Sequence, residues 1–485
     1  MRKDDKAILR ALEDHHIDSS KYGLGLTKFR EIRESLGLFR TRKQEHSLDT
    51  IKPAMIRLRA QYPKAGARDM VGLLFHEEKM GVSRALVVKY FALYEPELVR
   101  ERRKNRLRRK HFWAAGVNDI WAVDQHNKWK YKFGLALHSC TDPFVGVMHW
   151  MKIWWTNSNP RLILSYHLDR VEEIGGKQCS DPGTENYGLA NGHTLLRHLH
   201  DPSLEGTLQH RWMVKKKNVM PEIGWSQLRH RFTPGFEDIL DVGVNNGWYN
   251  PDILLEALVF RYVFIPWLQQ ELDAYHDRIN NTAKRADRNK ILPHGVPNDI
   301  YEHPSDYGVL DFKIKVRQNA IDTVRNLYAP KDHEVFQLVP PDFAAIVSQM
   351  YVEIGQPPVT RQSCWDIYLQ LLNCFHTLDN IYNIPTDVDA KWGYALTLAC
   401  DDYAKEIELL PNLRPLRNGD SVISPGGFCY MGGVNNGDGL DAQQCAHLDE
   451  MLNNNEPQIE NDDDPQIFAC FSDEEFTGPD EVDEW

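Results

Sequence analysis

The stretch NDIWAVDQHNKWKYKFGLALHSC (118–140) and the following PFVGVMHWMKIWW (143–155) decide the fold of this chain. Both segments are rich in Trp, Val, Tyr and Phe and partly alternate apolar with polar residues, which is the pattern of half-buried strands. The sequence TDP at 141–143 supplies turn residues between them. We therefore predict three antiparallel strands at about residues 119–127, 130–139 and 144–154.

Helical and extended patterns alternate after these strands. We predict a helix at 160–174, a short strand that ends at Asp181, and a second helix at about 187–200. A strand near 211–216 then precedes a helix that begins near Pro221, a residue suited to a first helical turn. A three-stranded meander followed by alternating helix and strand is the order of a ribonuclease H-like α/β domain.

The regions on either side of this core are predicted to be mainly helical. Within residues 1–100 the apolar residues recur every three to four positions, and Gly81, Val82 and Ser83 resemble the turn and N-cap of a helix-turn-helix unit. The alternative for this head is a plain helical bundle with a solvated basic surface. We predict a basic linker at 101–114, a catalytic core at 115–300, a helical accessory region at 301–430 and a disordered acidic tail at 431–485.

Charge is distributed unevenly along the chain, whose net charge is −12. Residues 1–110 contain 27 Lys and Arg against 15 Asp and Glu, a net of +12, whereas residues 431–485 contain 16 acidic residues and no basic ones. The segment ERRKNRLRRK (101–110) is its most basic part. A basic head predicts a polyanionic partner such as nucleic acid, with a solvated linker helix as the alternative for 101–110.

Several classes of protein and site are disfavoured. No apolar run reaches the roughly 18 residues of a membrane span, and the N-terminus lacks the apolar region of a secretory signal. The eight cysteines form no CxxC pair, which indicates reduced thiols in the cytosol or nucleus and argues against a structural zinc module. The spacing of His126, His138 and His149 is not typical of zinc ligands, so packing or hydrogen bonding is the preferred interpretation.

Three acidic residues are candidates for chemistry. Asp124 lies inside an apolar strand, where a carboxylate is costly unless it is paired or bound to a cation. Asp181 lies where the short strand meets the loop DPGTEN, and Glu222 follows Pro221 in the first turn of a helix. Each also has a structural explanation: an edge-strand residue, a turn residue, and a carboxylate that compensates the helix dipole.

Taken together, the motifs around these acids resemble a known family. They are the W-x-x-D of Trp121 to Asp124, the S-D-x-G-x-E-N of Ser180 to Asn186, and the N-x-x-x-E of Asn218 to Glu222. This set resembles the catalytic core of retroviral and retrotransposon integrases and related bacterial transposases. Over about residues 115–300 the chain is also similar to transposon-derived integrase core domain proteins of fungi and animals. It departs from retroviral integrases because it lacks their His/His/Cys/Cys zinc domain.

The resemblance implies a mechanism and a set of metal ligands. Asp124, Asp181 and Glu222 would be the catalytic DDE triad and would bind two Mg²⁺ or Mn²⁺ ions, for which carboxylate oxygens are suitable ligands. The reaction implied is two-metal-ion phosphoryl transfer, with Asp124 shared between the ions. Gly183 is expected to permit a tight loop beside this site, and Asn186 to orient that loop.

Candidate DNA contacts lie around the triad and in the basic linker. Ser226 and Arg229 share a helix face with Glu222, and related transposases carry a DNA-contacting basic residue at the position of Arg229. Lys215, Lys216 and Lys217 precede this helix and either line the DNA path or form a solvated strand end. The linker residues predicted to contact DNA phosphates are Arg102, Arg103, Lys104, Arg106, Arg108, Arg109 and Lys110.

Three functions are compatible with these patterns. The leading hypothesis is a nuclear DNA integrase or transposase that acts on transposon ends and a target, and a homo-oligomer is compatible with this function. The second is a domesticated DNA-binding protein that keeps the fold without catalysis. The third is a ribonuclease H-like nuclease that cuts RNA–DNA hybrids, although such enzymes normally need a fourth acid and no helix-turn-helix head.

Overall fold

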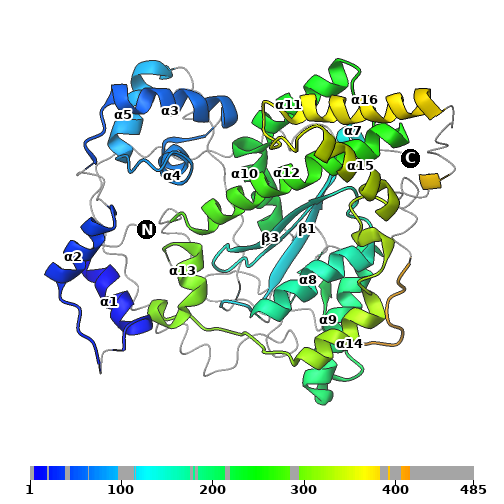
Figure 1. Ribbon diagram of the computed structural model, residues 1–485. Helices are drawn as coiled ribbons and strands as arrows, with labels where there is room; N and C mark the ends of the chain where they lie inside the picture. The colour runs from blue at the N-terminus through cyan, green and yellow to red at the C-terminus, as the bar shows by residue number, and fades with distance from the viewer. Residues whose placement is uncertain are drawn as a thin grey trace.

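The architecture combines a helical head, an α/β core and a C-terminal group of helices (Figure 1). The computed structural model describes residues 5–18, 21–38, 44–63, 65–96, 114, 116–174, 178–180, 184–212, 219–283, 294–382, 391–393 and 406–415. The acidic tail predicted at 431–485 and the basic linker residues 101–110 lie outside this part of the chain.

The core is built on a five-stranded mixed sheet with the strand order β3-β2-β1-β4-β5. The first three strands are antiparallel, whereas β4 runs parallel to β1 and β5 runs parallel to β4. The strands are β1 (Trp121–His126), β2 (Ala136–Thr141), β3 (Met148–Trp154), β4 (Gln178–Ser180) and β5 (Arg211–Trp212). The predicted three-stranded meander followed by alternating elements is therefore confirmed.

One prediction in the meander is wrong, because the second strand does not begin near residue 130. Lys128–Phe133 form the short helix α7 instead. Trp129 and Phe133 are both buried at a spacing of four, which a helix face satisfies, while Tyr131 between them is 78% exposed. A strand would have turned all three rings to one side. Gly134 then ends the helix in the left-handed conformation, with φ +66°.

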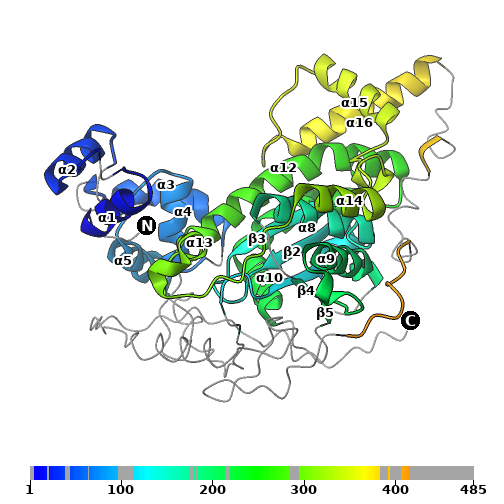
Figure 2. The ribbon, with the colours of Figure 1, turned by 90° about the horizontal axis from the view of Figure 1, so that it is seen from below.

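Helices cover both faces of the sheet, as Figure 2 shows from below. Trp121 and Val123 of β1 pack with buried residues of α8 (Pro160–Ile174), α9 (Tyr187–His200) and α14 (Gln318–Tyr328). The predictions of helices at 160–174 and 187–200 are confirmed. The opposite face lies under α10 (Val219–Arg231) and α12 (Leu254–Asn280).

Other elements complete the described fold. The C-terminal helices pack over α12 and share its apolar cluster. No helix in the described ranges is long and apolar enough to cross a membrane. The remaining helices of the core and its C-terminal side are α11 (Thr233–Asn245), α13 (Pro297–Glu302), α15 (Pro341–Glu353) and α16 (Cys364–Tyr382). The short 3₁₀ turns are η2 (Thr184–Asn186), η3 (Pro202–Leu204), η4 (Pro304–Tyr307) and η5 (Glu334–Phe336).

The described part of the head contains five helices, and serine side chains cap two of them. The Ser83 side chain accepts a hydrogen bond from the Leu86 amide at 3.2 Å and caps α5, which confirms the predicted turn and cap at 81–83. In the first two helices, buried Asp5 pairs with Arg30 and Arg33. The helices are α1 (Asp5–His15), α2 (Leu26–Ser35), α3 (Leu48–Gln61), α4 (Ala67–His76) and α5 (Arg84–Tyr94).

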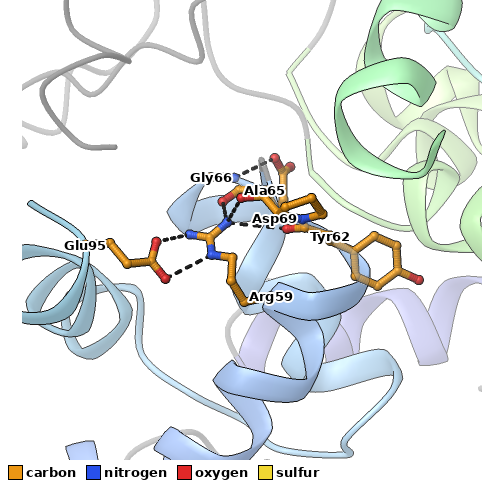
Figure 3. Close-up of polar contacts among 7 residues, drawn as sticks. Arg59, Tyr62, Ala65, Gly66, Asp69 and Glu95 are labelled. Atoms are coloured by element: carbon orange, nitrogen blue, oxygen red, sulfur yellow. Dashed lines mark hydrogen bonds and ion pairs between the residues drawn. The ribbon is translucent and has the colours of Figure 1, made fainter. Parts of the chain in front are cut away.

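A single arginine links the loop between α3 and α4 to the end of α5 (Figure 3). Arg59, near the end of α3, donates from Nη1 to the carbonyl oxygens of Pro63 and Ala65, each at 2.8 Å. Its Nε donates to Glu95 at 2.9 Å, just beyond the end of α5. Because the pair is largely buried, these bonds fix the loop after α3 and the end of α5 against one another.

The head is docked directly on the core. Asp69 of α4 pairs with Arg231 at the end of α10, with 3.1 Å between Oδ2 and Nε. Glu77, which follows α4, pairs with Arg278 of α12 at 2.6 Å. At the start of α11, a Cβ atom on Gly235 would lie 2.1 Å from the carbonyl oxygen of Gln61, so α3 and α11 approach at a point where only glycine fits. Buried apolar residues of both parts form one cluster.

Several histidines are buried within the described core, among them His138, His167 and His210. Burial lowers the pKa of each of His138, His167 and His210 to about 3, because an imidazolium would lose its hydration there. All three are therefore neutral in the folded protein near neutral pH, whereas the unfolded chain protonates its histidines near pH 6.5.

This burial predicts a loss of stability in acid. Because the unfolded state binds more protons, the free energy of unfolding should fall as pH drops from about 6.5 towards about 3. Urea unfolding between about pH 7 and pH 5 measures the slope. Replacing His167 with leucine should reduce this slope by up to about 1.4 kcal/mol per pH unit, which corresponds to the uptake of one proton on unfolding. Exposed His16→Gln is the control, and an unchanged slope in the His167 variant would contradict the prediction.

Candidate active site

Asp124 lies on the sheet face beneath α10. Alternation along β1 places Ala122, Asp124 and His126 on this face, opposite to Trp121 and Val123. The side chain of Trp225, from α10, donates its indole N–H to Oδ2 of Asp124 at 3.0 Å. The helix predicted to carry the third acid therefore packs directly over the first.

Trp225 links Asp124 to a second residue of the same strand. Its ring stacks on the imidazole of His126, with 5.3 Å between ring centroids and 19° between ring planes. The indole is 6% exposed, so its hydrogen bond to the carboxylate is shielded from water. The sequence motifs do not include Trp225, although its position three residues after Glu222 makes the two neighbours on the helix surface.

His126, the last residue of β1, lies near two positively charged side chains. The pKa of His126 falls to about 4, first because the ring is buried and then because the cations of Lys128 and Arg229 lie close to it. His126 is therefore neutral at neutral pH. These two cations, one from α7 and one from α10, are suited to attract phosphate groups.

Some of the predicted site residues come together and others lie outside the described residues. Asp124 meets α10, which also carries Arg229 and half-buried Ser226. Position 222 lies in the same helix, but the Glu222 side chain is not described. The predicted residues outside the described part are Asp181, Gly183, Lys215, Lys216, Lys217, Arg102, Arg103, Lys104, Arg106, Arg108, Arg109 and Lys110.

Asn186 is described and lies at the end of η2. It is buried, and its side-chain amide donates to Glu185 at 3.0 Å. The turn leads straight into α9, where a Cβ atom on Gly188 would lie 2.3 Å from the carbonyl oxygen of Pro160. The loop is thus held close against the start of α8, and the predicted orienting role of Asn186 stays a prediction.

The described side chains contain no group of three or more His, Cys, Asp or Glu residues arranged to hold a metal ion. Two of the three predicted ligands, Asp181 and the side chain of Glu222, lie outside this described part of the chain. His126, His138 and His149 each have a separate aromatic partner, respectively Trp225, Trp150 and Trp121.

Comparison with known proteins identifies the α/β core. Residues 112–304 match the family model of the integrase core domain. The chain contains an integrase core domain. No curated protein and no solved structure matches the chain. The match spans the whole five-stranded sheet and the helices from α7 to α13, and it confirms the resemblance found in the sequence motifs.

The integrase core domain sets the general chemistry to be expected. It has a ribonuclease H-like α/β fold, in agreement with the sheet order seen here. Domains of this superfamily carry out polynucleotidyl transfer, bind nucleic acids and generally use divalent metal ions. Asp124, a carboxylate beneath α10 on the strand that ends at His126, is the described residue of this domain best suited to such chemistry.

Proposed function

We propose that the chain is a DNA integrase or transposase in which Asp124, Asp181 and Glu222 together bind two Mg²⁺ or Mn²⁺ ions. The observation that carries this proposal is the hydrogen bond from Trp225 to Asp124. It ties two segments that are 101 residues apart in sequence, β1 and α10, at the carboxylate itself. The W-x-x-D motif that ends at Asp124 is thereby held against the helix that carries position 222.

The geometry of α10 supports Glu222 as the third acid. Residues three apart on a helix are neighbours on its surface, with about 5–6 Å between their Cβ atoms. Position 222 is three residues before Trp225, whose indole contacts Asp124. The backbone of α10 thus brings position 222 to within one helical turn of the residue that touches the first carboxylate.

The pairing of β4 with β1 supports Asp181 as the second acid. These strands are parallel, and Ser180 is the register partner of Val123. Asp181 directly follows Ser180, and Asp124 directly follows Val123. Since consecutive Cα atoms are only about 3.8 Å apart, each acid is one residue beyond this register pair. Adjacent parallel strands thus lead directly to both acids.

The residues around these acids have complementary tasks. Carboxylate oxygens are suitable ligands for Mg²⁺ and Mn²⁺, and a bound pair of ions would supply nucleophile activation and stabilisation of the leaving oxygen. Trp225 holds the Asp124 carboxylate in one orientation. Lys128 and Arg229 attract and orient the phosphates of the DNA strand.

A cleavage assay tests the proposal against its alternatives. Full-length protein is incubated with Mn²⁺ and a DNA duplex that carries candidate terminal repeats, in parallel with the Asp181→Asn variant and with an RNA–DNA hybrid. We expect metal-dependent nicking or joining of the DNA, lost in the variant. Binding without cleavage would instead make the chain a DNA-binding protein, and cleavage of the hybrid alone would make it a ribonuclease.

Replacing Trp225 with phenylalanine should separate orientation from metal binding. The ring can still stack on His126, but Asp124 loses a hydrogen bond from a buried donor, worth roughly 1.5–3 kcal/mol for a charged group. We expect the single-turnover cleavage rate to fall about tenfold or more. Trp248→Phe, in the loop after α11, is the matched control. Equal rates in both variants would show that the indole N–H does not orient Asp124.

A further inference from the structure

We infer that α7 forms a binding surface for an unpaired DNA end beside Asp124, where Tyr131 stacks on a base and Lys128 contacts the adjoining phosphate. This inference rests on the proposed function and deepens it, because it names the form of DNA that the site receives. It assigns a role to an exposed helix that the family motifs do not include.

The chain joins α7 directly to the end of β1, where contacts lead back to the candidate catalytic carboxylate. Asp124 accepts the indole N–H of Trp225, and Trp225 stacks on His126, the last residue of β1. Lys128, the first residue of α7, follows His126 by only two residues in the chain. Lys128 therefore lies at the same end of β1 as His126, which shares the ring of Trp225 with Asp124.

The orientation of α7 is fixed by its inward face. Trp129 and Phe133 are buried, and the indole N–H of Trp129 donates to Glu237 of α11 at 2.7 Å. Lys132 pairs with Asp241 of the same helix at 2.5 Å. With these anchors in place, α7 is held against α11 at two points along its length.

The outward face of α7 carries an aromatic ring and a cation. Tyr131 is 78% exposed, the highest value among the large apolar side chains that the structure describes as exposed. Lys128 is also exposed and precedes Tyr131 by three residues, so helical spacing places the two side by side. A rigid helix thus presents an aromatic ring and a cation together, at a fixed position relative to β1.

This combination fits a single strand better than a duplex. Proteins bind single-stranded nucleic acid with aromatic rings that stack on successive bases and with cations that follow the backbone. A base inside a duplex is already stacked on its neighbours, so Tyr131 can accept only an unpaired one. The lysine-rich sequence of α7, KWKYKF, places positive charges around the ring, and these charges attract the phosphates of DNA. The fitting partner is accordingly a frayed or overhanging DNA end.

Fluorescence of 2-aminopurine tests the stacking directly. The base is placed in the unpaired overhang of a DNA duplex, and full-length protein is added without divalent metal. We expect quenching by the wild type, loss of quenching in Tyr131→Ala and its retention in Tyr131→Phe. Tyr131→Ala should bind the overhang about tenfold or more weakly, with the affinity for a blunt duplex unchanged. Its circular dichroism melting curve checks that the fold is kept.

The salt dependence of binding tests the phosphate contact. Lys128→Gln should reduce the slope of log affinity against log salt by about one, because one fewer counterion is displaced. Lys331→Gln, at an exposed lysine after α14, is the control and should keep the wild-type slope. An unchanged slope in the Lys128 variant would remove the phosphate from this surface.

The outcomes separate this inference from the proposed function. Equal quenching by wild type and Tyr131→Ala, or no quenching by the wild type, would overturn the stacking at α7. Cleavage of the same DNA with Mn²⁺ is measured in parallel, with Asp181→Asn as its control. Cleavage without quenching would reject only the α7 surface, whereas quenching that depends on Tyr131, without any cleavage, would reject the catalytic proposal and keep the surface.

Discussion

Replacing Asp124 with asparagine is expected to slow metal-dependent DNA cleavage about a thousandfold, equivalent to roughly 4 kcal/mol of transition-state stabilisation. Asparagine has nearly the same size and can still accept the indole N–H of Trp225 through its amide oxygen. It loses the negative charge that would hold divalent cations. The measurement is the single-turnover cleavage rate over a series of Mg²⁺ and Mn²⁺ concentrations.

The control for this variant is a carboxylate remote from the site. Asp332 is exposed beyond the end of α14, so Asp332→Asn removes the same charge without affecting β1 or α10. We expect its cleavage rate to match the wild type, and both variants to keep the wild-type melting temperature. A cleavage rate in Asp124→Asn within a few-fold of the control would exclude Asp124 from the reaction.

The largest effect on stability is expected for Gly235→Ala. The added methyl group would lie 2.1 Å from the carbonyl oxygen of Gln61, so α3 and α11 must separate. Since backbone cannot yield as a flexible side chain does, we expect a loss of at least about 3 kcal/mol in the free energy of unfolding, the upper end for overpacking. Urea unfolding measures this loss, and limited proteolysis shows whether the head is released from the core.

Gly72→Ala is the matched control for this substitution. Gly72 lies inside α4, where the nearest atom to an added Cβ is Oγ1 of Thr282 at an ordinary 3.6 Å. Alanine is the better helix former by about 1 kcal/mol, so this variant should be as stable as the wild type or more stable. Equal stability of the Gly235 and Gly72 variants would mean that the head and core do not pack as closely as described.

Much of the fold could be predicted because apolar periodicity extends over whole elements. The helices at 160–174 and 187–200 and the order of the strands follow from patterns of this length. The helix α7 was missed because Trp129 and Phe133 fit both a strand and a helix face. Only the exposure of Tyr131, which depends on packing against α11, separates the two interpretations.

The candidate site could be predicted only in part. Local motifs single out the three acids, and the catalytic roles of Asp124, Asp181 and Glu222 stay predictions. No local pattern reveals that Trp225 bonds to Asp124, because that contact depends on how α10 lies across β1. The same holds for the pair of Asp69 and Arg231, which joins the head to the end of α10.

The segment that matches the family model is not expected to fold on its own, because it shares one apolar cluster with both flanking regions. Ile51 and Met70 of the head, and Phe343 and Tyr368 of the C-terminal helices, are buried in the cluster that contains α12. A polypeptide excised at residues 112 and 304 would leave that long helix uncovered on two sides. Such an excised piece is expected to aggregate, and biochemistry on the catalytic unit should retain both flanking helical regions.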